Sequence, residues 1–295
     1  MNSNRIKTKF IVNPIAGGGI TCDIIQIIKT LVNPNKFDIK IDFTCKPNEA
    51  TLLSKQAVLN NFNLVVAVGG DGTVNECLQA LIGTDVALGI IPTGSGNGFA
   101  YHFKIKRNIS EALLQFNKNS SRMIDVGSIN NFHFVNVSGI GFDAHIAKLF
   151  ANSKTRGFIN YLKLCLKELK YKSKNYSINV NNKSFDIKAY AIVFANASQY
   201  GNDAKISPLS IVDDGLIDFV IVKDFPNWKI PYFIYQVLKG RTHLNKNVEI
   251  IRAKSMIIKT DLPFVHVDGE VKELTNPITI KVNKEKIKIF PPNEK

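Results

Sequence analysis

A glycine-rich turn with one acid and one threonine carries the strongest chemical signal in this sequence. It consists of Gly69, Gly70, Asp71, Gly72 and Thr73, and it lies between a short apolar run and a helical pattern. Glycines let a phosphate approach the backbone closely, and the N-terminus of a helix offers free N–H groups and a positive dipole end. A carboxylate at this place could hold Mg²⁺ or polarise a hydroxyl group. The turn therefore predicts a phosphate-binding site with an acid at its centre.

Two further glycine-rich turns follow the same plan. One is Thr93-Gly94-Ser95-Gly96-Asn97-Gly98, and the other begins at Asn13-Pro14 and includes Gly17. Each comes directly after a predicted strand and before a predicted helix. Three such turns in one small domain favour a nucleotide site, because several backbone segments could then hold one polyphosphate.

The elements that position these turns alternate between strand and helix over the first 125 residues. Apolar runs at 64–68 and 87–91 are typical of strands buried on both faces, and helical apolar spacing follows the first of them. This alternation predicts an α/β domain with a doubly wound parallel sheet, in which ligands bind beyond the carboxyl ends of the strands. Residues 126–295 contain many short strands, among them one expected over 279–290, and predict a mainly antiparallel, β-sandwich-like domain.

Several common site signatures are absent from the sequence. No G-x-x-x-x-G-K-[ST] motif occurs, and the turn at 94–98 matches neither the G-x-G-x-x-G dinucleotide fingerprint nor the G-x-S-x-G elbow of hydrolases. The five histidines show no H-x-x-x-H spacing, which disfavours zinc chemistry. P-loop enzymes, dinucleotide oxidoreductases and zinc hydrolases are therefore disfavoured.

The charge and hydropathy of the chain limit its partners and location. A net charge of +14 favours anionic partners, but the lysines are spread out and predict no nucleic-acid groove. No apolar run approaches the roughly 18–20 residues of a membrane span, and the N-terminus lacks the apolar core of a signal peptide. These features predict a cytoplasmic protein that binds no nucleic acid.

The three turns, with two acidic turns near the C-terminus, resemble the diacylglycerol kinase catalytic family. The acidic turns are Asp213-Asp214-Gly215 and Asp268-Gly269-Glu270. The family includes bacterial lipid kinases and the sphingosine and ceramide kinases. The resemblance implies an NAD-kinase-like ATP-binding domain over residues 1–125 and a β-rich lipid-binding domain over 126–295. It also implies an ATP-dependent, Mg²⁺-dependent kinase that phosphorylates a hydroxyl of diacylglycerol or of a sphingoid-type lipid.

The resemblance assigns roles by position. Glu270 would accept the proton of the lipid hydroxyl, with Asp71 as the second candidate. A structural Mg²⁺ site would use Asp214 and the backbone carbonyls of Ile211 and Leu216. The residues that would line the ATP site are Asn13, Pro14, Gly17, Thr44, Gly69, Gly70, Asp71, Gly72, Thr73, Glu76 and Thr93. Many bacterial members have an acid where this chain has Gly98, which leaves the identity of the acceptor lipid open.

A lipid substrate implies work at a membrane surface. Residues 157–170 combine lysines with an apolar stripe and predict either a peripheral contact with the inner membrane face or a surface helix packed on the core. The stripe comprises Phe158, Tyr161, Leu162, Cys165 and Leu169. The sequence is compatible with a monomer and with a homodimer.

Two other functions remain as alternatives. NAD kinases and phosphofructokinases also carry a Gly-Gly-Asp-Gly turn, so a kinase with a soluble substrate is one alternative, although Asn75-Glu76 favours the lipid branch. A lipid-binding relative without catalysis is the other.

Overall fold

The computed structural model describes residues 5–18, 23–153, 157–273 and 275–292. The chain forms two compact units, which are described separately. The first unit comprises residues 1–124 and 285–295, and the second comprises 125–284.

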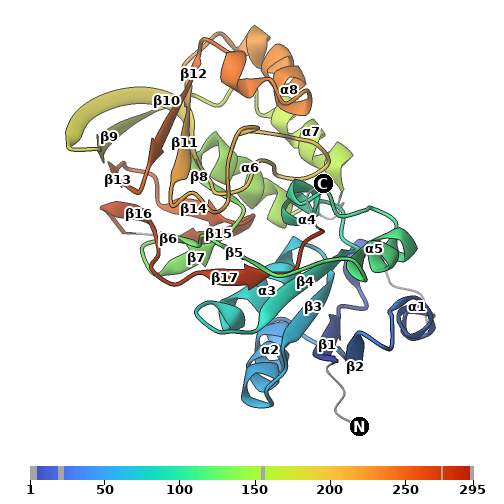
Figure 1. Cartoon of the computed structure of the whole chain (residues 1–295). Coiled ribbons are helices and arrows are strands. Elements are labelled where there is room, and N and C mark those ends of the chain that lie inside the picture. Colours follow the sequence, from blue (N-terminus) through green and yellow to red (C-terminus); the bar gives the residue numbers. More distant parts are fainter. Residues whose placement is uncertain (1–4, 19–22, 154–156, 274, 293–295) are drawn as a thin grey trace. The chain divides into compact units, whose positions relative to one another are not determined.

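The first unit is built on a six-stranded sheet with the order β2-β1-β3-β4-β17-β5 (Figure 1). The first four strands along the chain are parallel, β17 is parallel to β4, and β5 is antiparallel to β17. Strands β3 and β4 are buried at every residue, as their continuous apolar runs predict. The bounds are β1 Ile6–Val12, β2 Phe37–Phe43, β3 Leu64–Gly69, β4 Ala87–Pro92, β5 Arg122–Ile124 and β17 Ile287–Ile289.

The chain reverses its direction of winding between β1 and β3. It runs from β1 outward to β2 and returns past β1 to β3, so right-handed crossovers place α1 and α2 on opposite faces of the sheet. Ligands of doubly wound sheets bind at such a switch point, beyond the carboxyl ends of the strands. The helices of this unit are η1 Ala16–Gly18, α1 Ile24–Leu31, α2 Glu49–Leu59, α3 Asp71–Leu81, α4 Gly98–His102 and α5 Ile109–Phe116.

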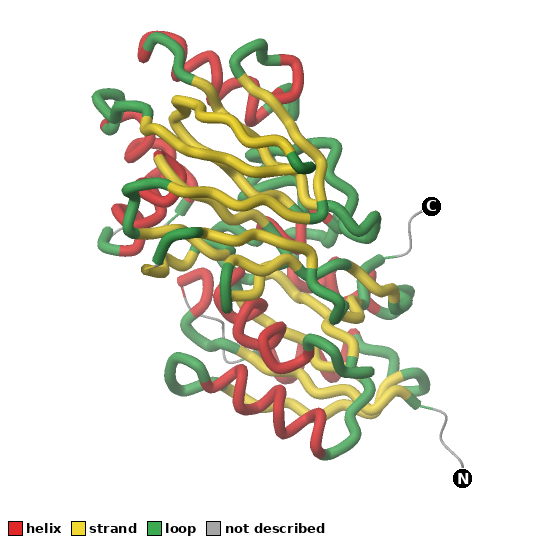
Figure 2. Tube along the Cα trace, turned by 90° about the vertical axis from the view of Figure 1, so that its left-hand side faces the viewer, coloured by secondary structure: helices red, strands yellow, loops and turns green. Residues whose placement is uncertain are grey.

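The second unit consists of antiparallel strands that form a single sheet system, seen as the long yellow strands of Figure 2. Strand β10 is its centre, because it pairs with β8, β9 and β11. The bounds are β6 Gly127–Ile129, β7 Phe132–Phe134, β8 Val137–Gly141, β9 Lys174–Val180, β10 Lys183–Ala195, β11 Ile217–Lys223, β12 Val248–Ala253, β13 Ser255–Lys259, β14 Phe264–Val267, β15 Glu270–Glu273 and β16 Ile278–Val282.

One face of these strands encloses a large core that includes Phe194, Phe219 and Met256. The opposite face packs a smaller core against helical segments. The helical segments of this unit are α6 Phe142–Ala151, α7 Phe158–Lys167, η2 Asn227–Lys229, α8 Ile230–Leu238 and η3 Thr242–Leu244.

The predicted fold class is confirmed, with a parallel α/β unit and an antiparallel β-rich unit. The single strand expected over 279–290 is instead two strands, β16 and β17, which belong to different sheets. The expected division into 1–125 and 126–295 therefore differs from the structure, in which residues 285–295 return to the first unit. Apolar alternation predicts that a segment is extended, but it does not indicate which sheet the segment joins.

Candidate active site

The three glycine-rich turns come together at the switch point of the first sheet. The side-chain amide of Asn13 donates a hydrogen bond to Oγ1 of Thr73 across 3.0 Å. The backbone N–H of Thr93 donates to the carbonyl of Gly69 across 2.9 Å. A Cβ atom on Gly17 would lie 1.9 Å from the carbonyl oxygen of Thr93, and this glycine has a φ of 66°. Only glycine fits there, because a side chain would collide with backbone and would have to adopt a left-handed conformation.

The first and second turns also approach each other as backbone. A Cβ atom on Gly94 would lie 2.5 Å from the Cα atom of Gly70, whereas a Cβ atom on Gly72 would meet nothing within 4 Å. The hydroxyl of Thr93 is buried and has no hydrogen-bond partner within the described part of the chain. A buried hydroxyl without a partner is costly, and a phosphate oxygen would satisfy it. The closely packed turns around Thr93 therefore fit the phosphates of a nucleotide.

The carboxylate of Asp71 joins these two turns. It accepts a hydrogen bond from the backbone N–H of Asn97 at 2.7 Å and further bonds from the amides of Gly98 and Phe99. Burial raises the pKa of Asp71 to about 6, and the bonds from the amides offset only part of this rise. These amide bonds tie the second turn to the start of α3.

Asn97 fixes the second turn from within. It has a left-handed backbone conformation, its Oδ1 accepts from the N–H of Gly94, and its Nδ2 donates to the carbonyl of Gly94 and to Oη of Tyr101. The side chain is buried. Asp71 and Asn97 therefore hold the backbone of both turns in place.

The other residues predicted to line the ATP site differ in their surroundings. Thr44 is buried at the carboxyl end of β2, and Pro14 lies in the turn after β1. Glu76 contacts the start of α2, where its Oε2 accepts from the N–H of Ala50 across 3.1 Å. This contact gives Glu76 a structural role in joining α3 to α2. Gly19 and Thr21 lie outside the described residues.

Glu270 lies in the second unit as the first residue of β15, directly after the tight turn that connects this strand to β14. The turn residues Asp268 and Gly269 have φ values of 48° and 91°, as a two-residue Asp-Gly hairpin turn requires. The Asp268 carboxylate accepts from the backbone N–H groups of Val135 and Asn136 at 3.1 and 3.0 Å. Glu270 itself is exposed, and its carboxylate lies 3.0 Å from Nζ of Lys272. The hairpin is thus firmly anchored, while the acid at its end stays accessible.

A buried polar cluster supports the same hairpin. Nδ1 of His266 accepts from the N–H of Gly269 across 3.2 Å, so the proton of the neutral ring is on Nε2. Nε2 lies 2.6 Å from Oδ2 of Asp143, which also accepts from Oη of Tyr200 at 2.9 Å. Burial raises the pKa of Tyr200 well above its usual value, and the charge of Asp143 adds to the rise. Tyr200 therefore remains a neutral donor.

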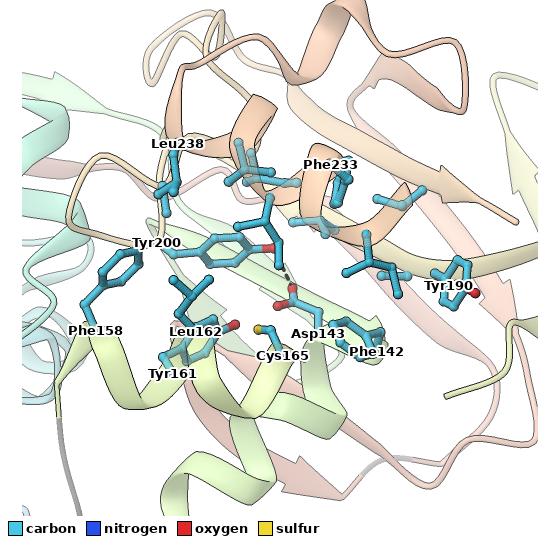
Figure 3. A pocket seen from close by; sticks show the side chains of 18 of the residues that line it. Phe142, Asp143, Phe158, Tyr161, Leu162, Cys165, Tyr190, Tyr200, Phe233 and Leu238 are labelled. Carbon is cyan, nitrogen blue, oxygen red and sulfur yellow. Dashed lines mark hydrogen bonds between the residues drawn. The ribbon is translucent and has the colours of Figure 1, made fainter. Parts of the chain in front are cut away.

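This cluster borders an apolar cavity of about 120 Å³ in the second unit (Figure 3). Helices α6, α7 and α8 and strands β10 and β11 line it. Figure 3 shows Phe158, Leu162 and Cys165 on one side and Phe233 on the other, with the bond between Tyr200 and Asp143 between them. Asp143 and Tyr200 are thus polar groups in an otherwise aliphatic and aromatic lining.

The apolar stripe of residues 157–170 is part of this lining. Phe158, Tyr161, Leu162 and Cys165 all border the cavity, and Leu169 packs against a neighbouring cluster of buried side chains. The stripe therefore faces the interior of the unit, as expected for a helix packed on the core.

The predicted structural Mg²⁺ site has a cationic side chain in place. Nη2 of Arg252 lies 2.5 Å from Oδ2 of Asp214, and the N–H of Leu216 donates to Oδ1 at 3.0 Å. Nε of Arg252 binds Asp218 as well. Within the described residues no group of three or more histidines, cysteines and acids could hold a metal ion. The donors on Asp214 thus do not fit metal ligation in this arrangement, even though Ile211 is near in sequence and half exposed.

Comparison with known proteins gives a consistent result. The family description of the diacylglycerol kinase catalytic domain matches residues 7–129, and that of the YegS C-terminal NAD kinase beta sandwich-like domain matches 136–291. The chain belongs to the diacylglycerol kinase catalytic family. It is therefore a lipid kinase, which is a phosphotransferase.

Individual relatives match along almost the whole chain. A diacylglycerol kinase of Bacillus subtilis is 26% identical over 276 residues, which cover 90% of this chain and 89% of the relative. A diacylglycerol kinase of Staphylococcus saprophyticus is 22% identical over 98% of this chain and 97% of the relative. A crystal structure of a diacylglycerol kinase from Bacillus anthracis has the same fold, with a TM-score of 0.75, 24% identity and 98% coverage of both chains.

Sequence reasoning missed the cluster of Asp143, Tyr200 and His266. A signal was present in part, since Asp143 follows Gly139-Ile140-Gly141-Phe142 at the start of a predicted helix. Its partners are 57 and 123 residues away along the chain, and no local pattern connects them. No helix within the described residues has the length and apolar character to cross a membrane.

Proposed function

We propose that this kinase transfers the γ-phosphoryl group of ATP to the hydroxyl of a lipid with at least one long acyl or alkyl chain. The apolar cavity with Asp143 in its lining is the observation that supports this acceptor class. A cavity of ~150 Å³ with such a lining stays dry and accepts a hydrocarbon about the size of benzene. The cavity of this unit would hold one segment of a lipid chain, and the carboxylate of Asp143 would accept a hydrogen bond from a polar group of the lipid.

The first unit would bind ATP through its three turns. Backbone N–H groups at the start of α3 and the free hydroxyl of Thr93 would contact phosphate oxygens. Asp71 would act as a positioning residue, because its carboxylate holds the second turn through three backbone amides. Mg²⁺ supplies charge neutralisation to phosphoryl transfer when it is bound with ATP.

Glu270 would accept the proton of the lipid hydroxyl. It is an exposed carboxylate on an anchored hairpin, which suits a base that must reach a substrate. Nζ of its neighbour Lys272 lies 3.0 Å from its carboxylate. We include in this proposal a peripheral association with the inner face of the cytoplasmic membrane.

An assay with labelled ATP tests the proposal. The acceptors are diacylglycerol, monoacylglycerol, sphingosine, ceramide and phosphatidylglycerol, with NAD and a sugar phosphate as soluble acceptors. We expect label in at least one lipid and a loss of about 10²–10⁴-fold in kcat for Glu270→Gln. Glu273→Gln is the matched control, since Glu273 is an exposed acid on the same strand. Label in NAD or sugar phosphate alone, or an unchanged rate in Glu270→Gln, would overturn the proposal.

A further inference from the structure

Helix α8 has apolar side chains on two opposite faces. Its inner face lines the cavity with Ile230, Phe233, Ile234, Val237 and Leu238. Its outer face should be polar if it met only water. Instead Tyr232 and Tyr235 are 59% and 49% exposed, and Trp228 in the preceding η2 is 76% exposed.

The exposed side chains are of one kind. Trp228, Tyr232 and Tyr235 are aromatic groups with one polar atom, and the two tyrosine rings stack with their centroids 6.4 Å apart. Tryptophan and tyrosine concentrate where a bilayer meets water, because their rings enter the apolar layer while the polar atom stays hydrated. This composition fits a lipid interface.

Positive charge lies beside these rings. Nζ of Lys229 is 5.1 Å from the centroid of the Trp228 ring. Asn227, which precedes Trp228, donates to the carbonyl of Leu169 and lines one hollow together with Lys170 and Lys172. In the described part of the chain these two lysines have no ion-pair partner. Lysines next to an aromatic surface would meet the phosphates of anionic lipids.

We propose that η2 and α8 dock on an anionic phospholipid bilayer, with Trp228, Tyr232 and Tyr235 at the lipid interface and Lys170, Lys172 and Lys229 on the headgroups. This inference rests on the proposed function, in which the inner face of α8 contacts the acyl chain of the substrate. One helix would then separate the bilayer from the cavity.

The protein carries its own probe for this contact. Trp228 is the single tryptophan of the chain, so its fluorescence reports on this surface alone. On addition of vesicles of phosphatidylglycerol and phosphatidylcholine, without ATP, we expect a blue shift of the emission and quenching by brominated acyl chains. High salt should reverse most of the shift, because it screens the lysines. Absence of any shift with phosphatidylglycerol vesicles would overturn the proposal and would leave a protein partner for this face.

Variants separate this surface from the rest of the protein. The double variant Tyr232→Ser, Tyr235→Ser should lower the sedimentation of the protein with vesicles at least tenfold. Leu59→Ser is the matched control, since Leu59 is 81% exposed on α2 and should bind vesicles as wild type does. Equal vesicle binding by the double variant and the wild type would contradict the proposed docking surface.

Activity measurements distinguish failure of this inference from failure of the proposed function. The double variant should keep wild-type kcat toward a short-chain, water-soluble diacylglycerol and lose most of its rate on lipid in vesicles. Loss of both rates would instead assign the tyrosines a structural role and overturn the inference. If the wild type phosphorylates no lipid in either form, the proposed function fails, and the fluorescence result still decides the docking surface.

Discussion

Nε2 of His266 lies 2.6 Å from Oδ2 of Asp143, while Nδ1 of the same ring accepts the backbone N–H of Gly269. One buried ring therefore connects the lining of the apolar cavity to the hairpin that presents Glu270. His266 and Asp143 are both buried. A change in the orientation of the imidazole would move the hairpin.

The two hydrogen bonds of His266 can be tested separately. In His266→Asn the amide oxygen lies near the position of Nδ1 and can still accept from Gly269, whereas in His266→Gln the amide reaches only toward Asp143. We expect kcat for the lipid to fall by about 10–100-fold in His266→Gln and much less in His266→Asn, because a displaced catalytic group is costly. The KM for ATP should change in neither variant. A purely structural role would lower the melting temperature and kcat of both variants equally, and that result would exclude a positioning role.

The raised pKa of Asp71 should make the free energy of unfolding fall, and the activity rise, as the pH increases through about 6. Its pKa is about 6 in the folded protein and near 3.8 in the unfolded chain, so between these values the folded state binds more protons. The contribution of this group to the free energy of unfolding is therefore fully present at low pH. It decreases by up to about 3 kcal/mol as the pH rises through about 6. Activity should fall over the same range as the pH drops, since a neutral Asp71 holds the backbone amides of Asn97, Gly98 and Phe99 less well.

The variant Asp71→Asn isolates this effect. Its free energy of unfolding, measured by urea titration from pH 4 to pH 8, should lack the wild-type decrease, and its kcat should be low at every pH. Asp85→Asn is the control, because Asp85 is fully exposed and should keep the wild-type profile. Parallel profiles for wild type and Asp71→Asn would refute the assigned pKa.

Arg252 should make the second unit insensitive to Mg²⁺. Its guanidinium already neutralises Asp214 and Asp218, so we expect the melting temperature of the wild type to be the same in Mg²⁺ and in EDTA. Arg252→Gln should lower the free energy of unfolding by about 2 kcal/mol, because Asp218 is buried and loses a charged donor. In that variant Oδ2 of Asp214 becomes free, and Mg²⁺ should raise the melting temperature. A rise in the wild type would show that the ion displaces the guanidinium.

A larger side chain in the cavity should affect the lipid and not the nucleotide. Ala191 lies in β10 and lines the cavity, so Ala191→Leu would fill part of its volume. We expect the KM for a long-chain lipid to rise at least tenfold and the KM for ATP to stay constant, with a loss of about 1–3 kcal/mol in stability from overpacking. Steady-state kinetics with each substrate varied in turn measure both values. An unchanged KM for the lipid would remove the cavity from the substrate path.

The sequence was informative where a site is made of neighbouring residues. The turns at Gly69 and Thr93 each consist of consecutive residues that directly follow a predicted strand. Because the carboxyl ends of parallel strands lie at one edge of the sheet, the sequence predicts that the two turns are close to each other. The Asp268-Gly269 hairpin turn can be predicted from the sequence as well, because its residues are consecutive. The network of Asp143, Tyr200 and His266 was not predictable, because it joins three distant segments in an antiparallel sheet whose register no local pattern determines. The inward orientation of the stripe on α7 also depends on packing, since helical periodicity identifies an apolar face without indicating what covers it.

The position of β17 has a consequence for the synthesis of the protein. This strand lies between β4 and β5, yet it consists of residues 287–289. The ribosome synthesises the chain from its N-terminus. In the sheet that carries the three glycine-rich turns, β4 and β5 therefore lack the strand between them until these residues emerge. The second unit is continuous in sequence and has all its strands earlier. The half of the protein that is translated first is thus the half that is completed last.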